Sequence, residues 1–237
     1  EKKLREDKIK LESLSGFLFE PVLGVGGVHI LRQPAYKAVA NKCHEADALI
    51  IADEATTGFG RTGAFLASEK LEPKPDIVCL GKAITNGEFP LSATLLSERV
   101  WNMLDVSSDE DMEKFLYGST YAGHPSGCFA ASKVLELIDG QLLAEVNKKG
   151  QWLGEKLMEL RKKHPALVKE VRGCGLMWAI EFPTRAISCK AWFELIKRGV
   201  RVAEEGRPLV LMPPFTISYG ELELAINTIN EVLASLT

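Results

Sequence analysis

Two short apolar runs end in residues that could do chemistry together. The run ALIIADE ends in Asp53 and Glu54, and the run PDIVCLGKA ends near Gly81 and Lys82. Continuous apolar runs bounded by turn residues are typical of strands buried on both faces of a parallel sheet. Ligands bind outside the carboxyl ends of such strands, so we expect Asp53 and Lys82 to face one crevice. The predicted fold class is α/β with a parallel-rich sheet.

The chemistry of Asp53 and Lys82 suits a pyridine that carries an aldehyde. The apolar neighbours of Lys82 predict a desolvated, neutral amine that can attack a carbonyl carbon. A carboxylate at the end of an apolar strand needs a cationic partner, and a protonated pyridine nitrogen would be one. Spacing alone leaves a second interpretation open, in which Lys82 and Asp53 form a structural salt bridge.

The elements that position this pair follow from the hydrophobic pattern. Residues 14–22 predict a strand. Regular pairing ends at Pro21, because proline has no N–H to donate to the hydrogen bonds of a sheet. A helix from Pro34 to about residue 46 would bury Ala35, Val39 and Cys43 on one face. Together with the strand that ends at Asp53, these elements form a β-α-β unit.

The repeating strand-and-helix pattern changes near Gly140. A long amphipathic helix is predicted from Leu142 to Lys163, followed by a strand or hairpin in VKEVRGCGLMWAIEF and a final helix over residues 219–236. We therefore predict two domains, residues 1–140 and residues 141–237, the second a small α+β unit. The chain begins at a glutamate and soon enters a strand, which we interpret as a start in mid-fold.

Composition excludes several classes of function. The 237 residues carry a net charge of -3, without the basic excess that nucleic-acid binding needs. No apolar run approaches the roughly 20 residues that cross a bilayer. The expected location is cytoplasmic, or an organelle matrix if a targeting segment was lost. The five cysteines are widely spaced without a C-x-x-C pair, and the four histidines have no metal-ligand spacing, so no metal site is expected.

Two loops invite a ligand interpretation. Ser119 and Thr120 precede a helix that begins near Pro125, and hydroxyls with free N–H groups at a helix start can bind an anion or simply cap the helix. The glycines of LGVGGVHI resemble a nucleotide-binding loop, but that motif opens a helix, whereas the residues that follow here are extended. A plain loop is the preferred interpretation of this second segment.

The motifs IADEATTGFGRTG, DIVCLGKAITNG, YGSTYAGHPSGCFAA and VRGCGLMWAIEF occur in this order and resemble the class III pyridoxal-phosphate aminotransferases. This family includes the ornithine, ω-amino acid and diaminopelargonate aminotransferases and has fold type I. The resemblance implies that Lys82 is the Schiff-base lysine and Asp53 the partner of the pyridine nitrogen. It also implies that Thr120, with Ser119, reaches the cofactor phosphate of the opposite subunit in a homodimer with shared active sites.

The resemblance covers the carboxyl-terminal half of such an enzyme. The expected structure is therefore part of the large domain plus the small domain, and an amino-terminal half would be missing. Ala55 stands where the family usually has valine or isoleucine behind the ring. The expected activity is transfer of an amino group between an amine or ω-amino acid donor and a keto acid or aldehyde acceptor. A non-catalytic or incomplete subunit, and an aminomutase or decarboxylase, are the alternatives.

Substrate recognition departs from the family pattern. Val25, Val210 and Ala203 stand where related enzymes have a glutamate or an arginine that contacts substrate. A guanidinium is the usual group for holding a carboxylate, so Arg201 or Arg207 would have to replace it. A further prediction places Trp178 at the substrate entrance, although a packing role is the alternative.

Overall fold

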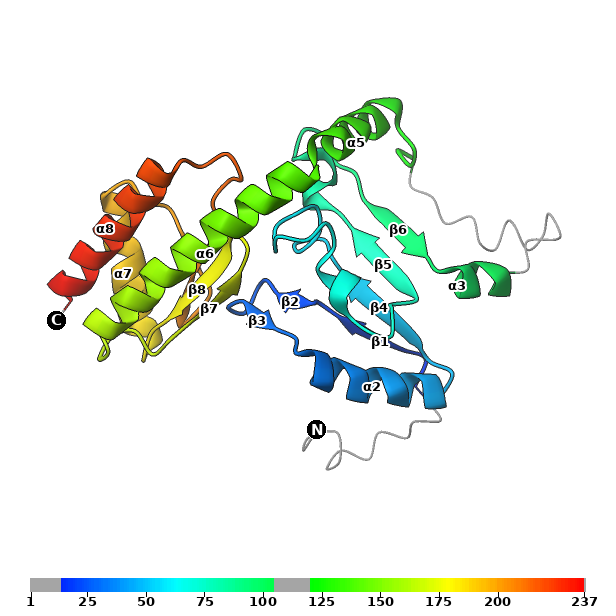
Figure 1. The fold of residues 1–237 in the computed structure, drawn as a ribbon, viewed down its shortest axis with the longest axis horizontal. Helices are drawn as coiled ribbons and strands as arrows, with labels where there is room; N and C mark the ends of the chain where they lie inside the picture. Colours follow the sequence, from blue (N-terminus) through cyan, green and yellow to red (C-terminus); the bar gives the residue numbers. More distant parts are fainter. Residues whose placement is uncertain (1–13, 105–119, 237) are drawn as a thin grey trace. The chain divides into compact units, whose positions relative to one another are not determined.

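The computed structural model describes residues 14–104 and 120–236, which divide into two compact units (Figure 1). The first unit contains the described residues up to Pro21 and within Leu31–Phe59 and Leu66–Leu137. The second contains Val22–Ile30, Gly60–Phe65 and the described residues from Ile138 onward. The assignment of residues 1–140 to a large domain and residues 141–237 to a small domain stays a proposal.

The first unit is built on a four-stranded sheet with the strand order β1-β4-β5-β6. Strands β1, β4 and β5 are parallel, and β6 pairs antiparallel with β5. In chain order, the elements of this unit are β1 (Gly16–Phe19), α2 (Gln33–Glu45), β4 (Leu49–Asp53), a 3-10 helix (Ala67–Lys70), β5 (Ile77–Leu80), a 3-10 helix (Lys82–Thr85), β6 (Ala93–Leu96), α3 (Glu98–Met103) and α5 (Pro125–Leu137). The prediction of an α/β fold with a parallel-rich sheet is confirmed.

Helix α2 covers one face of this sheet, as Figure 1 shows. Pro34 lies in its first turn, where a missing N–H costs nothing. The buried face carries Tyr36, Ala40 and Cys43, so the prediction of Ala35 as a buried residue was wrong. The helix is rotated because the large ring of Tyr36 packs on Phe19, with 5.1 Å between ring centroids.

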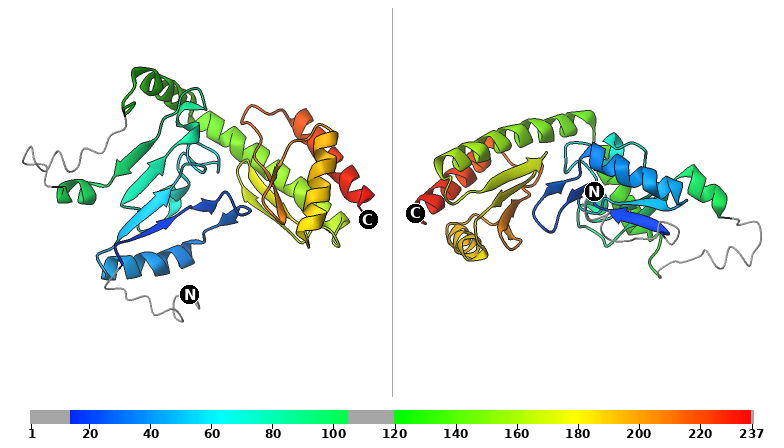
Figure 2. Two further views of the ribbon diagram at one scale, coloured as in Figure 1. Left: turned by 180° about the vertical axis from the view of Figure 1, so that it is seen from behind. Right: turned by 90° about the horizontal axis from the view of Figure 1, so that it is seen from below.

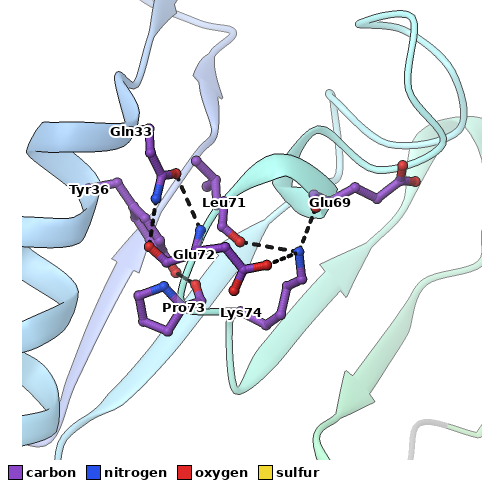
Figure 3. Close-up of polar contacts among 7 residues, drawn as sticks. All are labelled: Gln33, Tyr36, Glu69, Leu71, Glu72, Pro73 and Lys74. Atoms are coloured by element: carbon purple, nitrogen blue, oxygen red, sulfur yellow. Dashed lines mark hydrogen bonds and ion pairs between the residues drawn. The ribbon is translucent and has the colours of Figure 1, made fainter.

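Polar contacts fasten the segment before β5 to α2 (Figure 3). The Tyr36 hydroxyl donates to the carbonyl oxygen of Pro73 at 2.6 Å. The Gln33 side chain donates to the carbonyl of Glu72 at 2.6 Å and accepts from the Glu72 N–H at 3.2 Å. Lys74 donates to the carbonyl of Glu69 at 2.6 Å. These bonds hold the connection between β4 and β5 on the face that α2 covers.

A buried carboxylate sets the start of β5. One oxygen of Asp76 accepts from the Ile50 N–H at 2.9 Å, and the other accepts from the Arg99 guanidinium at 2.9 Å. The hydrogen bond and the charge of Asp76 raise the pKa of Arg99. Because Ile50 lies in β4, this carboxylate aligns β5 with its neighbour.

The second unit contains an antiparallel sheet with the strand order β7-β8-β10-β9 and three helices beside it (Figure 2). Its elements are β2 (Val22–Leu23), β3 (His29–Ile30), α6 (Gly140–Lys163), β7 (Glu170–Cys174), β8 (Met177–Glu181), α7 (Arg185–Lys197), β9 (Ala203–Glu204), β10 (Pro208–Leu211) and α8 (Tyr219–Ser235). The helices pack on one face of the sheet around Leu153, Ile180 and Leu209. Among the residues that the structure describes, no helix has both the length and the apolar character needed to cross a bilayer.

The hairpin of β2 and β3 covers the other face of this antiparallel sheet. Val28 is fully buried against Met177, Ala179 and Val210. The Arg172 guanidinium donates to the carbonyl of Gly27 at 2.6 Å and contacts Glu181 at 2.6 Å. The sequence pattern predicted a plain loop of the first half at residues 23–30, whereas these residues pack into the second unit.

The buried Tyr36 hydroxyl predicts a loss of stability at high pH. Burial, followed by the negative charge of Asp76, raises its pKa from 10.0 to about 12. Below pH 10 the phenol is neutral in both the folded and the unfolded chain, so it does not change the free energy of unfolding with pH. Between pH 10 and 12 the unfolded chain loses the proton more readily, so folding becomes less favourable.

From pH 8 to pH 11, we expect the free energy of unfolding to fall by about 1 kcal/mol less in Tyr36→Phe than in the wild-type chain. Urea titrations at the two pH values measure this difference. Tyr219→Phe, an exposed change in the other unit, controls for removal of a hydroxyl. Equal losses in Tyr36→Phe and the wild-type chain would contradict the prediction.

Candidate active site

Asp53 and Lys82 lie at the carboxyl ends of two neighbouring parallel strands. Asp53 is the last residue of β4 and pairs in register with Cys79 of β5. Lys82 follows the end of β5 by two residues and begins a 3-10 helix. The sheet therefore brings the predicted carboxylate and the predicted amine to the same edge.

The Asp53 carboxylate keeps one oxygen for a ligand. Its Oδ1 accepts from the Ala55 N–H at 2.9 Å, and within the described residues Oδ2 has no hydrogen-bond partner. Burial, together with the charge of Asp53, raises the pKa of the Cys79 thiol. No ion pair joins Asp53 to Lys82 in the part of the chain that the structure describes, so the structural salt bridge is absent there.

Lys82 adopts a conformation that few residues other than glycine take up. Its φ of 45° lies in the left-handed region, which costs a lysine on the order of 1 kcal/mol. Its Nζ donates to the Thr56 hydroxyl at 2.5 Å. The prediction of a desolvated amine was wrong for this chain, because the side chain leaves the strand end and is exposed.

Ala55 lies across from the start of the lysine turn. A Cβ built on Gly81 would lie 3.6 Å from the Cβ of Ala55, which is ordinary van der Waals contact. Gly81 itself is extended and buried. Ala55 therefore lies beside the residue that precedes Lys82.

Glu54, which stands next to Asp53 at the end of the same apolar run, is fully buried and has a structural role that the sequence pattern did not predict. Glu54 accepts from the Thr57 hydroxyl at 2.5 Å, from the Ala67 N–H at 3.1 Å and from the Ser68 N–H at 2.6 Å. Three donors offset the cost of burying the charge. A hydroxyl three residues after an acid in a turn was the signal that could have revealed this arrangement.

Thr120 is exposed and precedes α5, while Ser119 lies outside the described residues. The start of α5 is fixed by His124, which stacks on Phe89 with 4.8 Å between ring centroids and accepts from the Ser126 N–H at 3.2 Å. Helix α5 packs against the 3-10 helix that begins at Lys82. This packing concerns the helix after Thr120, and the predicted contact of Thr120 with a cofactor phosphate stays a proposal.

The three predicted substrate residues belong to the second unit. Arg201 is exposed and has no hydrogen bond or ion pair within the described residues. Arg207 contacts Glu181 at 3.0 Å. Trp178 donates to the carbonyl of Gly175 at 2.9 Å, and its ring lies where a side chain on Gly154 would be. This placement gives Trp178 a packing role, and its predicted place at a substrate entrance stays a proposal.

A family model described as aminotransferase class-III matches residues 2–233. The chain therefore belongs to the class-III aminotransferase family, as the motifs predicted. Its fold is the mixed α/β fold of the pyridoxal-phosphate-dependent transferases of fold type I.

Solved structures of transaminases are similar along almost the whole chain. An amine transaminase from an uncultivated Pseudomonas species, in its PLP-bound form, is 31% identical with a TM-score of 0.90, over 100% of this chain and 56% of that one. A thermostable (S)-enantioselective ω-transaminase from Thermomicrobium roseum is 31% identical with a TM-score of 0.87, over 99% of this chain and 54% of that one. The PMP-bound aminotransferase from Vibrio fluvialis is 26% identical with a TM-score of 0.89, over 99% of this chain and 54% of that one. The chain thus spans about half the length of these relatives.

The contacts of Glu54 predict that its charge stabilises the turn after β4. Glu54→Gln keeps the size of the side chain but aims an amide NH2 at one of the three donors. We expect the free energy of unfolding to fall by about 2 kcal/mol in urea titrations. Glu88→Gln, at an exposed position of the same unit, should change it by less than about 0.5 kcal/mol. A Glu54 variant as stable as this control would show that the carboxylate is dispensable.

Proposed function

We propose that this chain forms part of a pyridoxal-phosphate-dependent aminotransferase. The observation that carries the proposal is the position of Asp53 and Lys82 at the carboxyl ends of adjacent parallel strands. Family membership and the PLP-bound and PMP-bound forms of its structural relatives support it.

The residues at this edge fit the cofactor. The Oδ2 atom of Asp53 would accept from the protonated pyridine nitrogen, and the exposed Lys82 amine would bind the aldehyde carbon. Ala55, beside Gly81, would face the ring with a small side chain and pack loosely. Thr120 and Ser119 would bind the phosphate from the partner subunit of a homodimer. When bound, pyridoxal phosphate supplies an electron-poor ring that stabilises negative charge on the substrate carbon.

Lys82 would also transfer the proton. With the substrate amine bound in its place, Lys82 Nζ would take the proton from the substrate carbon as general base and, as the resulting ammonium, return it at the cofactor's aldehyde carbon as general acid. Nζ donates a hydrogen bond to the Thr56 hydroxyl at 2.5 Å, and this contact would help to orient the amine. The left-handed backbone of Lys82 turns the side chain out of the strand direction.

The substrate class that we propose is an amine or ω-amino acid donor with a keto acid or aldehyde acceptor, including diaminopelargonate-like donors. Val210 is fully buried in β10, so this position provides no cation for a carboxylate. Arg207 already contacts Glu181, so Arg201 is the better candidate for holding a substrate carboxylate. Glu204 accepts from Arg185 at 3.4 Å and from the Gly206 N–H at 3.2 Å.

One alternative has its own support. The chain spans little more than half of its relatives, which favours an incomplete subunit that binds cofactor only with the rest of the enzyme. An aminomutase or decarboxylase would share Asp53 and Lys82, and dependence on a keto acid or release of carbon dioxide would separate these reactions. A cytoplasmic or organelle-matrix location stays a proposal.

Borohydride reduction in the presence of pyridoxal phosphate tests the proposed function. We expect peptide mass spectrometry to find the reduced adduct on Lys82 and to find none there in Lys82→Ala. Lys133→Ala, which removes an exposed lysine from α5, should leave the adduct on Lys82 unchanged. Asp53→Asn should raise the cofactor concentration for half-labelling about tenfold, because the bond to a charged nitrogen is lost.

Labelling spread over many surface lysines, and unchanged by Lys82→Ala, would contradict a cofactor site in this chain. Labelling of Lys82 that appears only after the rest of an aminotransferase is supplied would favour the incomplete subunit.

A further inference from the structure

A hollow in the second unit combines apolar walls with a carboxylate. It lies beside α7, β9 and the end of α8, and Figure 1 shows α7 next to α8. Its volume of about 600 Å³ falls in the range of small-molecule sites. The lining residues that carry the argument are Cys189, Trp192, Phe193, Glu204, Ser235 and Leu236. We call this space the α7 hollow.

The apolar wall of the α7 hollow contains Trp192, Phe193 and Leu236. Phe193 is 54% exposed, and the other two side chains are partly exposed. The Nζ of Lys197 lies 4.5 Å from the centroid of the Phe193 ring and pairs with Glu194 at 2.9 Å, so the Glu194 carboxylate already has a cation. A ligand with an apolar body would bury this wall, and burial of apolar surface is favourable in proportion to its area.

The side-chain donors of the α7 hollow, apart from the exposed Lys190, are already used. The indole N–H of Trp192 and the hydroxyl of Ser235 donate to backbone carbonyls at 3.0 Å and 2.7 Å. The thiol of Cys189 donates to Oε1 of Glu204 at 3.5 Å. A ligand that only accepts hydrogen bonds therefore finds few donors in this space.

Glu204 supplies an acceptor instead. Besides the Cys189 thiol, its Oε1 accepts from the Gly206 N–H at 3.2 Å and from Arg185 at 3.4 Å, whereas Oε2 has no hydrogen-bond partner within the described residues. Arg185 is 74% exposed, so water screens its charge and this ion pair contributes little. The Glu204 side chain is only 20% exposed, and a carboxylate in such a place gains from a positively charged donor.

We propose that the α7 hollow binds a primary amine with an apolar body, as its ammonium ion. The ammonium group donates to Oε2 of Glu204, and the apolar body packs on Trp192 and Phe193. This inference goes beyond the proposed function, because all of these residues belong to the second unit and the site needs neither cofactor nor Lys82.

Alkylation of Cys189 by iodoacetamide tests the proposal on the full chain without cofactor, because this thiol is partly exposed and lines the hollow. We expect 4-phenylbutylamine at about ten times its Kd to slow this reaction about tenfold, since only the unoccupied protein reacts. Cys128, which is exposed on α5 of the first unit, should react at an unchanged rate. Peptide mass spectrometry measures both rates.

Two analogues with the same apolar body test the charge of the ligand. The alcohol 4-phenylbutanol and the acid 4-phenylbutyrate should each need at least an about tenfold higher concentration than the amine for equal protection, because neither brings a positive charge to Glu204.

Glu204→Gln keeps an oxygen for the Gly206 N–H but removes the charge. In calorimetric titrations it should raise the Kd of the amine about tenfold and change the Kd of the alcohol less than about twofold. Glu223→Gln, an exposed change on α8 outside the lining, is the matched control and should bind the amine as the wild-type chain does. Lys82→Ala should also bind it normally. Circular dichroism verifies that the variants are folded.

Several results would overturn the proposal. Cys189 could resist alkylation without any ligand, which would mean that the hollow is covered, or the amine could fail to protect it. The alcohol or the acid could protect as well as the amine, or Glu204→Gln could bind the amine as tightly as Glu223→Gln. Loss of binding in Lys82→Ala would place the amine at the candidate active site instead. Because cofactor is absent, none of these results depends on aminotransferase activity.

Discussion

The parallel pairing of β4 with β5 is the constraint on which the candidate site depends. It places Asp53 opposite Cys79 and brings Lys82 to the same edge, although 28 positions separate the two residues in the sequence. The Asp76 carboxylate fixes the start of β5 on β4. Glu54 fixes the turn that leaves β4. Two buried carboxylates thus fix the amino end of β5 and the turn at the carboxyl end of β4.

Local pattern was enough to predict much of this structure. The apolar runs before Asp53 and Lys82 gave the strands, and their turn residues gave the parallel arrangement. Contacts between distant segments were not predictable from pattern. The face of α2 is set by Tyr36 packing on Phe19, so Ala35 points to solvent. The segment 22–30 packs into the second unit because Val28 fits against Met177, which no local signal reveals. The apolar neighbours of Lys82 wrongly predicted burial, because the left-handed turn directs its side chain outward.

The central claim is that Asp53 and Lys82 hold one pyridoxal phosphate between them. A crystal structure of the chain reduced with borohydride in the presence of the cofactor tests it most directly. The account predicts a bond from Lys82 Nζ to the cofactor's aldehyde carbon and an Asp53 carboxylate oxygen within about 3 Å of the pyridine nitrogen. A cofactor attached to another lysine, or a pyridine nitrogen far from Asp53, would contradict the account.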